Sequence, residues 1–189
     1  TGTRGPSTFF SSDLSDDYFF VGELGLGWEL PSARAGRVGL GVWRHTGKWA
    51  TFDGGEKSGT SGVYALAEQR LWARDPNDSD SDAGLHVFAQ FGWADRDVSE
   101  IELHAAAGLT LLGAFGSRED DAAGVYVSWA RMNERAGYDA DETAIEFFYR
   151  LQLTPWISLK PDVQVILNPG GDGRAETAVV ASLRAEIVF

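Results

Sequence analysis

The sequence predicts an all-β protein, and within that class an antiparallel transmembrane β-barrel of the outer-membrane type. Apolar and polar residues alternate along about nine segments of the 189-residue chain, the pattern of strands with two unlike faces. Most segments run for about 10 to 13 residues, whereas strands of soluble proteins average about 5 or 6. A tilted strand that crosses a bilayer needs about 9 to 11 residues. The chain also ends on an aromatic residue, Phe189, as many outer-membrane barrels do.

The predicted strands are separated by turns that contain Gly, Pro and Asp. They cover residues 18–30, 37–46, 62–72, 84–94, 101–113, 122–132, 142–153, 156–168 and 177–189. In the first strand, Leu24, Leu26 and Trp28 share one face, while Glu23 and Glu29 lie on the other. This division predicts one face against lipid and one against water.

The second and third strands have the weakest patterns. The second is spaced with glycines and contains Trp43, and a longer loop is expected after it at 47–60. In the third, Glu68 and Arg70 share a face with Trp72, so the apolar face is not clear. Turns are expected before the second strand, at 31–36, and after the third, at 74–83.

The next three strands alternate more cleanly. In the strand at 84–94 the odd-numbered residues from 85 to 93 are apolar, and the even-numbered ones include two polar side chains. In the strand at 101–113, Glu102 and His104 face away from a row of Leu and Ala. The strand at 122–132 carries apolar residues at 125, 127 and 129 on one side.

The last three strands predict a polar interior. Each sets an apolar row against a row that contains charged residues, and the three rows together hold both signs. If the apolar rows meet lipid, the charged rows line a watery lumen, and salt bridges across neighbouring strands are expected. The predicted lumenal residues are Glu146, Arg150, Gln152, Lys160, Asp162, Gln164, Arg184 and Glu186.

Hairpin parity assigns the connections to the two sides of the membrane, counting back from a periplasmic C-terminus. The loops at 47–60, 95–100, 133–141 and 169–176 are expected outside. The turns near residues 31, 74, 114 and 154 are expected in the periplasm. This topology depends on the strand count.

Composition agrees with a barrel and excludes other classes. The chain has no run of 18 apolar residues, so no helical membrane span is predicted. A mean hydropathy of -0.19 suits a barrel, because only every second strand residue meets lipid. The net charge of -12 disfavours nucleic-acid binding, which requires a basic surface. Cysteine is absent, which excludes disulfides and thiol nucleophiles.

The sequence carries no catalytic signature, and we expect neither an enzyme nor a cofactor. His86 and His104 lie on neighbouring predicted strands but lack a third metal ligand. The spacing of Asp78, Asp80 and Asp82 resembles the start of a calcium loop. The Gly and Glu that such a loop requires at its sixth and twelfth positions are missing, so a solvated turn is the expected structure.

One stretch of the C-terminal third is long and distinctive. It contains Leu153-Thr154-Pro155-Trp156, then Lys160-Pro161-Asp162-Val163-Gln164, then Asn168-Pro169-Gly170-Gly171, and it leads into the terminal strand. Weaker similarities occur at 91–95, 118–121 and 39–47. With these residues the chain resembles the carbohydrate-selective porin family of the OprB type.

This resemblance implies a sugar channel in the bacterial outer membrane, with about sixteen strands around a narrow, charged constriction. Sugars would diffuse through it passively as their hydroxyl groups exchange water for polar side chains, and aromatic rings could stack on their apolar faces. The pore-lining or substrate-binding candidates are Glu146, Arg150, Asp162, Gln164, Arg184, Glu186 and Glu102.

The strand count departs from the family, since about nine strands cannot close a barrel of about sixteen. We therefore expect residues 1–189 to be the C-terminal portion of a single porin barrel domain, with residues 1–17 contributing to an outer loop. The expected partners are small sugars or other solutes, outer-membrane lipid, the N-terminal half of the barrel and, in a homo-oligomer, further copies.

Three alternatives stay open at the level of sequence. A general ion or solute porin would share the fold but lack sugar selectivity. A soluble β-sandwich binding module would bury its apolar face inside the protein. A structural envelope protein would conduct nothing.

Overall fold

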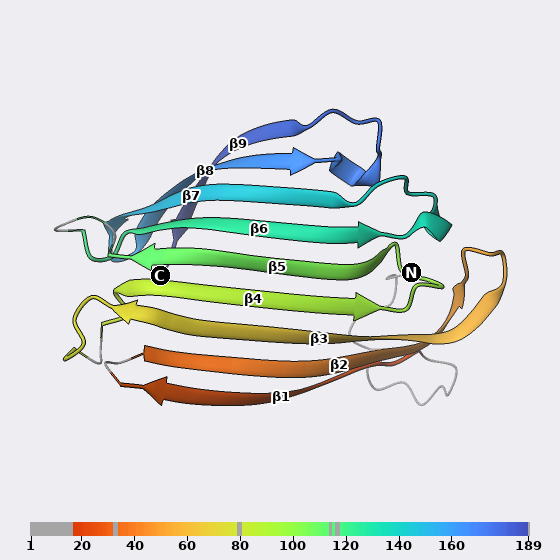
Figure 1. Ribbon diagram of the computed structural model, residues 1–189, viewed down its shortest axis with the longest axis horizontal. Helices are drawn as coiled ribbons and strands as arrows, with labels where there is room; N and C mark the ends of the chain where they lie inside the picture. The colour runs from red at the N-terminus through yellow and green to blue at the C-terminus, as the bar shows by residue number, and fades with distance from the viewer. Residues whose placement is uncertain (1–16, 32–33, 79–80, 114, 116–117, 189) are drawn as a thin grey trace.

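The computed structural model describes residues 17–31, 34–78, 81–113, 115 and 118–188. Within them, nine strands form one antiparallel sheet in which each strand pairs with the next in the chain (Figure 1). This arrangement confirms the predicted all-β fold and its strand number. Phe189 and residues 1–16 lie outside the described residues. The strands are β1 (Phe19–Leu30), β2 (Arg34–Ala50), β3 (Glu56–Ala73), β4 (Gly84–Ala94), β5 (Ile101–Leu112), β6 (Ala122–Met132), β7 (Glu142–Thr154), β8 (Ile157–Leu167) and β9 (Ala178–Ile187).

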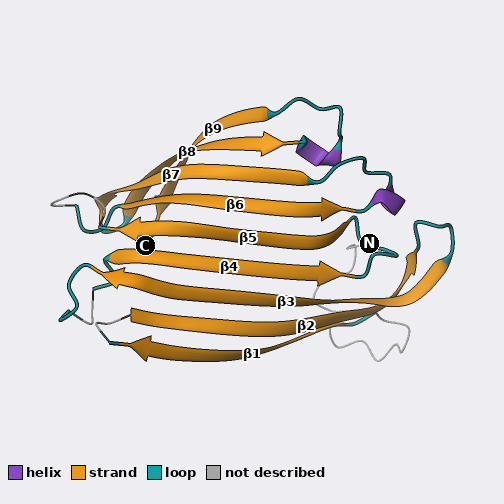
Figure 2. Cartoon of the chain, in the orientation of Figure 1, coloured by secondary structure: helices purple, strands orange, loops and turns teal. Residues whose placement is uncertain are grey.

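The connections gather at two opposite ends of the sheet (Figure 2). The loops after β2, β4, β6 and β8 share one end, together with the short 3-10 helices η2 (Glu134–Ala136) and η3 (Pro169–Gly171). We call this the outer end and the opposite one the periplasmic end, following the predicted topology. Across the described part of the chain, no helix is long and apolar enough to span a bilayer.

The described sheet is a single layer with almost no buried core. The buried hydrophobic residues among those described are four alanines: Ala73, Ala83, Ala106 and Ala122. Large apolar side chains instead remain exposed on one face, as with Leu24 at 83 % and Leu183 at 67 %. A β-sandwich would cover such a face with a second sheet, so the single layer contradicts that alternative and suits contact with lipid.

The β2–β3 hairpin is longer than the sequence predicts. A loop is expected at 47–60, but strand pairing continues from Lys48 opposite Ser58 to Ala50 opposite Glu56, and only residues 51–55 remain between the strands. A bulge beside His45 shifts the register, so the alternation is broken there although the strand continues. The turn expected at 31–36 is also too long, because β2 begins at Arg34.

A second bulge explains the mixed faces of β3. Arg70 pairs with His86 and Trp72 with Leu85, so Leu71 is an extra residue on this strand. One extra residue moves everything after it to the opposite face. Arg70 is accordingly 5 % exposed and Trp72 is 52 % exposed. The prediction that Trp72 shares a face with Arg70 was wrong for this reason.

The turn between β5 and β6 is held by a buried carboxylate. Asp121 is 1 % exposed and accepts hydrogen bonds from Arg118 Nε at 2.5 Å, from the Tyr149 hydroxyl and from the Gln152 amide at 2.8 Å. These bonds, chiefly the one from Arg118, lower the pKa of Asp121 to about 2. The ionised carboxylate therefore fastens this turn to β7 at the periplasmic end.

Replacing this carboxylate should destabilise the periplasmic end. We expect Asp121→Asn to lower the free energy of unfolding by about 2 kcal/mol, because hydrogen bonds to a charged acceptor are lost from a buried site. Tryptophan fluorescence of the protein folded in detergent, followed through a urea titration, measures the change. Asp120→Asn, one residue away and exposed, is the matched control and should leave the midpoint unchanged.

The same carboxylate sets a pH dependence. Because the pKa of Asp121 is lowered by folding, its contribution to stability is complete above the ordinary carboxyl pKa of about 3.9. That contribution is lost as the pH falls toward 2. Asp121→Asn should therefore flatten the acid limb of the stability curve, and a limb identical to that of the unmodified protein would contradict this role.

Candidate pore wall

The face of the sheet opposite the exposed apolar side chains carries rows of residues that cross the strands. One row runs from Phe88 on β4 through Gly108, Tyr126 and Glu146 to Gln164 on β8, each residue opposite the next. Side chains on a strand alternate between faces, so residues in one register row share a face. The strands therefore carry one continuous polar face, opposite the exposed apolar face.

A polar cluster spans β7, β8 and β9 on this face. Lys160 Nζ lies 2.7 Å from Glu146 Oε1, and Gln164 Nε2 donates to Glu146 Oε2 at 3.3 Å and to Asp162 Oδ1 at 3.2 Å. Ser182 on β9 donates to the other oxygen of Asp162. Three of the predicted site residues are thus brought together, and the expected salt bridge across neighbouring strands is present.

Burial divides this cluster into an enclosed part and an open part. Asp162 is 5 % exposed, whereas the side chains of Glu146 and Lys160 keep 19 % and 25 % of their surface. A shielded carboxylate with several donors is stabilised in place. Asp162 is therefore held in place by its partners, while Glu146 and Lys160 stay partly exposed on the same face.

The other predicted residues of these strands lie at the margin of the cluster or beyond it. Arg150 is nearer the periplasmic end of β7, where Nη2 donates to the Asp120 carbonyl at 3.3 Å, and its buried Nε has no partner among the residues that the structure describes. Arg184 and Glu186 are exposed on β9, opposite Lys160 and Ser158. Within the described residues neither makes an ion pair of its own.

Glu102 belongs to a different environment from the other candidates. It sits at a bulge at the outer end of β5. Its carboxylate lies 2.9 Å from Arg131 Nε and 3.6 Å from Arg96 Nε, and its side chain is 12 % exposed. The structure thus ties Glu102 to the outer loops and not to the β7–β9 cluster.

Sequence analysis did not predict two contacts on the polar face. Ser182 caps Asp162 from the neighbouring strand, and the Phe148 ring lies 4.2 Å from Lys160 Nζ, a cation–π distance. Alternation alone places each residue on the polar face. Their contacts follow from the register, because Asp162 pairs with Phe148 on β7 and with Ser182 on β9. The register between two strands cannot be predicted from the alternation within one of them.

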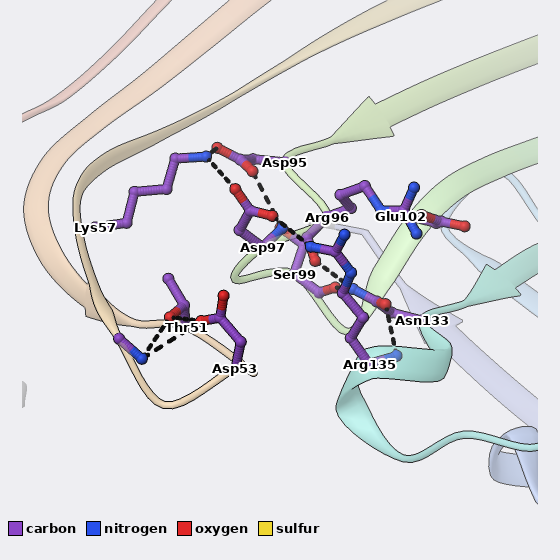
Figure 3. Close-up of polar contacts among 11 residues, drawn as sticks. Thr51, Asp53, Lys57, Asp95, Arg96, Asp97, Ser99, Glu102, Asn133 and Arg135 are labelled. Carbon is purple, nitrogen blue, oxygen red and sulfur yellow. Dashed lines mark hydrogen bonds and ion pairs between the residues drawn. The ribbon is translucent and has the colours of Figure 1, made fainter.

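Charged residues also join three outer hairpins (Figure 3). Lys57 Nζ on β3 lies 2.6 Å from Asp95 and 2.7 Å from Asp97, both in the loop after β4. Arg135 in η2 reaches the second carboxylate of that loop, with Nη1 2.8 Å from Asp97 Oδ1. The Phe52 amide donates to the Asp97 carbonyl at 3.1 Å. We call Lys57, Asp95, Asp97 and Arg135 the rim cluster.

Asn133 fixes the base of the rim cluster. It is 1 % exposed, and its side-chain amide donates to the carbonyls of Arg96 at 2.5 Å and Ser99 at 2.9 Å. Its side-chain oxygen accepts from the Arg135 amide at the start of η2. The hydrogen bond from Lys57 is the largest of the contacts that lower the pKa of Asp97, so this carboxylate is ionised at neutral pH.

A single-layer antiparallel sheet with one exposed apolar face and one face that carries charged residues is typical of the wall of an outer-membrane β-barrel. Residues 10–189 match the family described as carbohydrate-selective porin, OprB family. The chain belongs to this family, and its location is the bacterial outer membrane. The family resemblance of the C-terminal third is thereby confirmed over nearly the whole chain.

Individual relatives agree with this assignment. The chain is 22 % identical to Porin B of Pseudomonas aeruginosa over 89 % of its own length and 41 % of Porin B. The high-pH structure of Pseudomonas putida OprB matches 90 % of the chain and 48 % of its own chain, with a TM-score of 0.81 and 22 % identity. The low-pH structure matches with a TM-score of 0.54 and 23 % identity, over 88 % of this chain and 55 % of its own. The chain thus spans about half the length of these relatives.

The rim cluster should hold the outer loops together. We expect Lys57→Met to speed hydrogen exchange of the Phe52 amide several-fold, because the carboxylates that anchor the loop after β4 lose their shared cation. Exchange measured by mass spectrometry on peptides covering 51–55 reports the change. Lys48→Met is the matched control, since it removes a pair at 2.9 Å with Glu56 whose side chains are 72 % and 63 % exposed. Equal exchange in both variants would contradict the role of the cluster.

Proposed function

We propose that this chain forms part of the wall of a channel through which small sugars diffuse passively across the outer membrane. The observation that carries the proposal is the cluster of Glu146, Lys160 and Gln164 on the continuous polar face. Carboxylate, ammonium and amide groups can exchange hydrogen bonds with sugar hydroxyls as readily as with water. No covalent bond is made or broken, so these side chains act only as successive hydrogen-bond partners along the path.

The paired charges suit a neutral solute. Glu146 and Lys160 neutralise each other at 2.7 Å, so this pair presents hydrogen-bonding groups with little net charge. Membership of a carbohydrate-selective family supports a sugar as the solute. Glu146 and Gln164 are the proposed sugar partners, Asp162 is proposed to organise them, and Arg150, Arg184 and Glu186 are proposed to line the path elsewhere. For Glu102 we propose a role at the rim.

We further propose that residues 1–189 are one portion of a single larger barrel domain. Within the described residues, β1 and β9 each pair on one side only, and a sheet with open edges is not stable in lipid. The length of the relatives supports additional strands that close the barrel. Lipid on the apolar face completes the proposed assembly, and the same surface leaves room for a homo-oligomer.

The complete barrel should conduct ions and be blocked by sugars. Single-channel current in planar bilayers, titrated with glucose and maltose, measures this directly. We expect a dose-dependent fall in current, because a sugar in the path displaces ions. A steady current indifferent to every sugar would support a general solute porin instead, and the absence of any current would support a structural envelope protein.

Removing the cation of the cluster should change ion selectivity. Lys160→Gln leaves Glu146 without its partner, so we expect the reversal potential in a potassium chloride gradient to shift toward cation selectivity. Lys48→Gln, in the exposed pair on the outer hairpin, should shift it less. Equal shifts in both variants would contradict a lumenal position for the Glu146–Lys160 pair.

A further inference from the structure

A groove of about 470 Å³ lies on the exposed apolar face, near the outer end of β1 to β4. The backbone of Val21, Trp43 and Gly62 forms its floor, because side chains at these positions alternate to the opposite face. The walls belong to two neighbouring register rows of the apolar face, and the groove runs between them. The residues of the walls are Phe20, Gly22, Val42, Arg44, Ser61, Val63 and Trp93.

Small residues keep this groove open. Gly22 stands opposite Val42, and a Cβ atom built on it meets no other atom within 4 Å. Ser61 is the small residue of the other row and is half-buried. Most of the remaining wall is aliphatic or aromatic. The groove therefore offers an apolar trough to an acyl chain of the surrounding lipid.

A guanidinium group stands in the wall of the groove. Arg44 is exposed and shares the apolar face with Val42, and it makes no hydrogen bond or ion pair with any residue that the structure describes. By contrast, Arg131, which lies opposite Leu103 on the same face, is bound by Glu102 at 2.9 Å. Arg44 is thus a cation at the lipid-facing surface to which the described chain supplies no counter-charge.

Aromatic residues mark the depth of Arg44 in the membrane. Tyr18, Phe20 and Trp93 are exposed around the outer end of the groove, and the rings of the first two stack with centroids 6.2 Å apart. Exposed aromatic side chains form girdles at the level of the lipid headgroups in outer-membrane barrels. Arg44 therefore lies where the phosphate of a lipid would lie, with the apolar groove beside it.

We propose that this groove binds one lipid with an anionic phosphate headgroup. The guanidinium of Arg44 pairs with a phosphate, whose oxygens match its planar set of donors, and an acyl chain occupies the trough beside Gly22. The Ser61 hydroxyl, opposite Arg44, is a second donor to the headgroup. The site lies on the outside of the wall, so it is independent of the solute that passes through the lumen.

The alternative role of Arg44 is non-specific. A long cationic side chain near the headgroups attracts any anionic lipid without a shaped site. Filling the groove separates the two roles, since Gly22→Leu keeps the charge but removes the trough. Gly92→Leu is the matched control, because a Cβ at Gly92 is equally unobstructed while its register row, opposite Tyr64, lies on the polar face.

The test measures lipid retention by the complete barrel in detergent, with native mass spectrometry. The probes are lipid A, which carries phosphate groups, and phosphatidylcholine, whose phosphate is neutralised by choline. We expect one retained lipid A, and Arg44→Gln should raise its dissociation constant about fivefold, the effect of one cation at an anionic lipid surface. Gly22→Leu should raise it at least as much. Arg131→Gln and Gly92→Leu should leave it near the value of the unmodified barrel.

Four results would overturn the proposal. They are equal retention of phosphatidylcholine and lipid A, equal weakening by Arg44→Gln and Arg131→Gln, a Gly22→Leu variant that retains lipid as Gly92→Leu does, and displacement of the lipid by excess inorganic phosphate. Current in planar bilayers reports whether each variant inserts. Should Gly22→Leu fail to insert, the comparison of Arg44→Gln with Arg131→Gln decides the matter. Sugar block is measured separately and bears only on the proposed channel.

Discussion

The need to pair every backbone N–H and C=O group inside lipid governs the rest of this structure. No water is present in the bilayer core to satisfy an open group, so each strand hydrogen-bonds to its chain neighbour across nine antiparallel strands. Among the described residues, the pairing is irregular at four places, all toward strand ends: beside His45 and Arg70 and before Leu103 and Thr154. The middle of the wall stays regular, and that regularity keeps the apolar and polar faces separate.

Irregular strand pairing is tolerated at the strand ends but not in the middle of the wall. At the periplasmic end, Asp121 binds the Gln152 amide beside a bulge. At the outer end, Glu102 sits on a bulge between two guanidinium groups. Water and loops can compensate for broken pairing there, so charged side chains can be enclosed by partners on neighbouring hairpins. The wall is therefore regularly paired where it crosses the membrane, and specific charged contacts stabilise it at both ends.

The sequence predicts this fold best where alternation is uninterrupted. Strands β4 to β9 lie within a residue or two of their predicted bounds, since each has a clean apolar row. The β2–β3 hairpin was predicted too short because a bulge and several glycines interrupt the alternation of apolar and polar residues on which the prediction rests. The site follows the same rule. Alternation placed Glu146 and Gln164 on the polar face. The contacts of Asp162 with Ser182 and of Lys160 with the Phe148 ring depend on the register between strands.

Register also explains why charges on the last strand differ from those further inside the sheet. Glu146 has β8 beside it and meets Lys160 there. Arg184 and Glu186 lie on β9, which pairs with β8 alone among the described strands. On the proposed architecture another strand lies against the free edge of β9, because lipid cannot satisfy its backbone. The side chains of that strand then decide whether Arg184 and Glu186 gain ion-pair partners across the strands, as Glu146 does from Lys160.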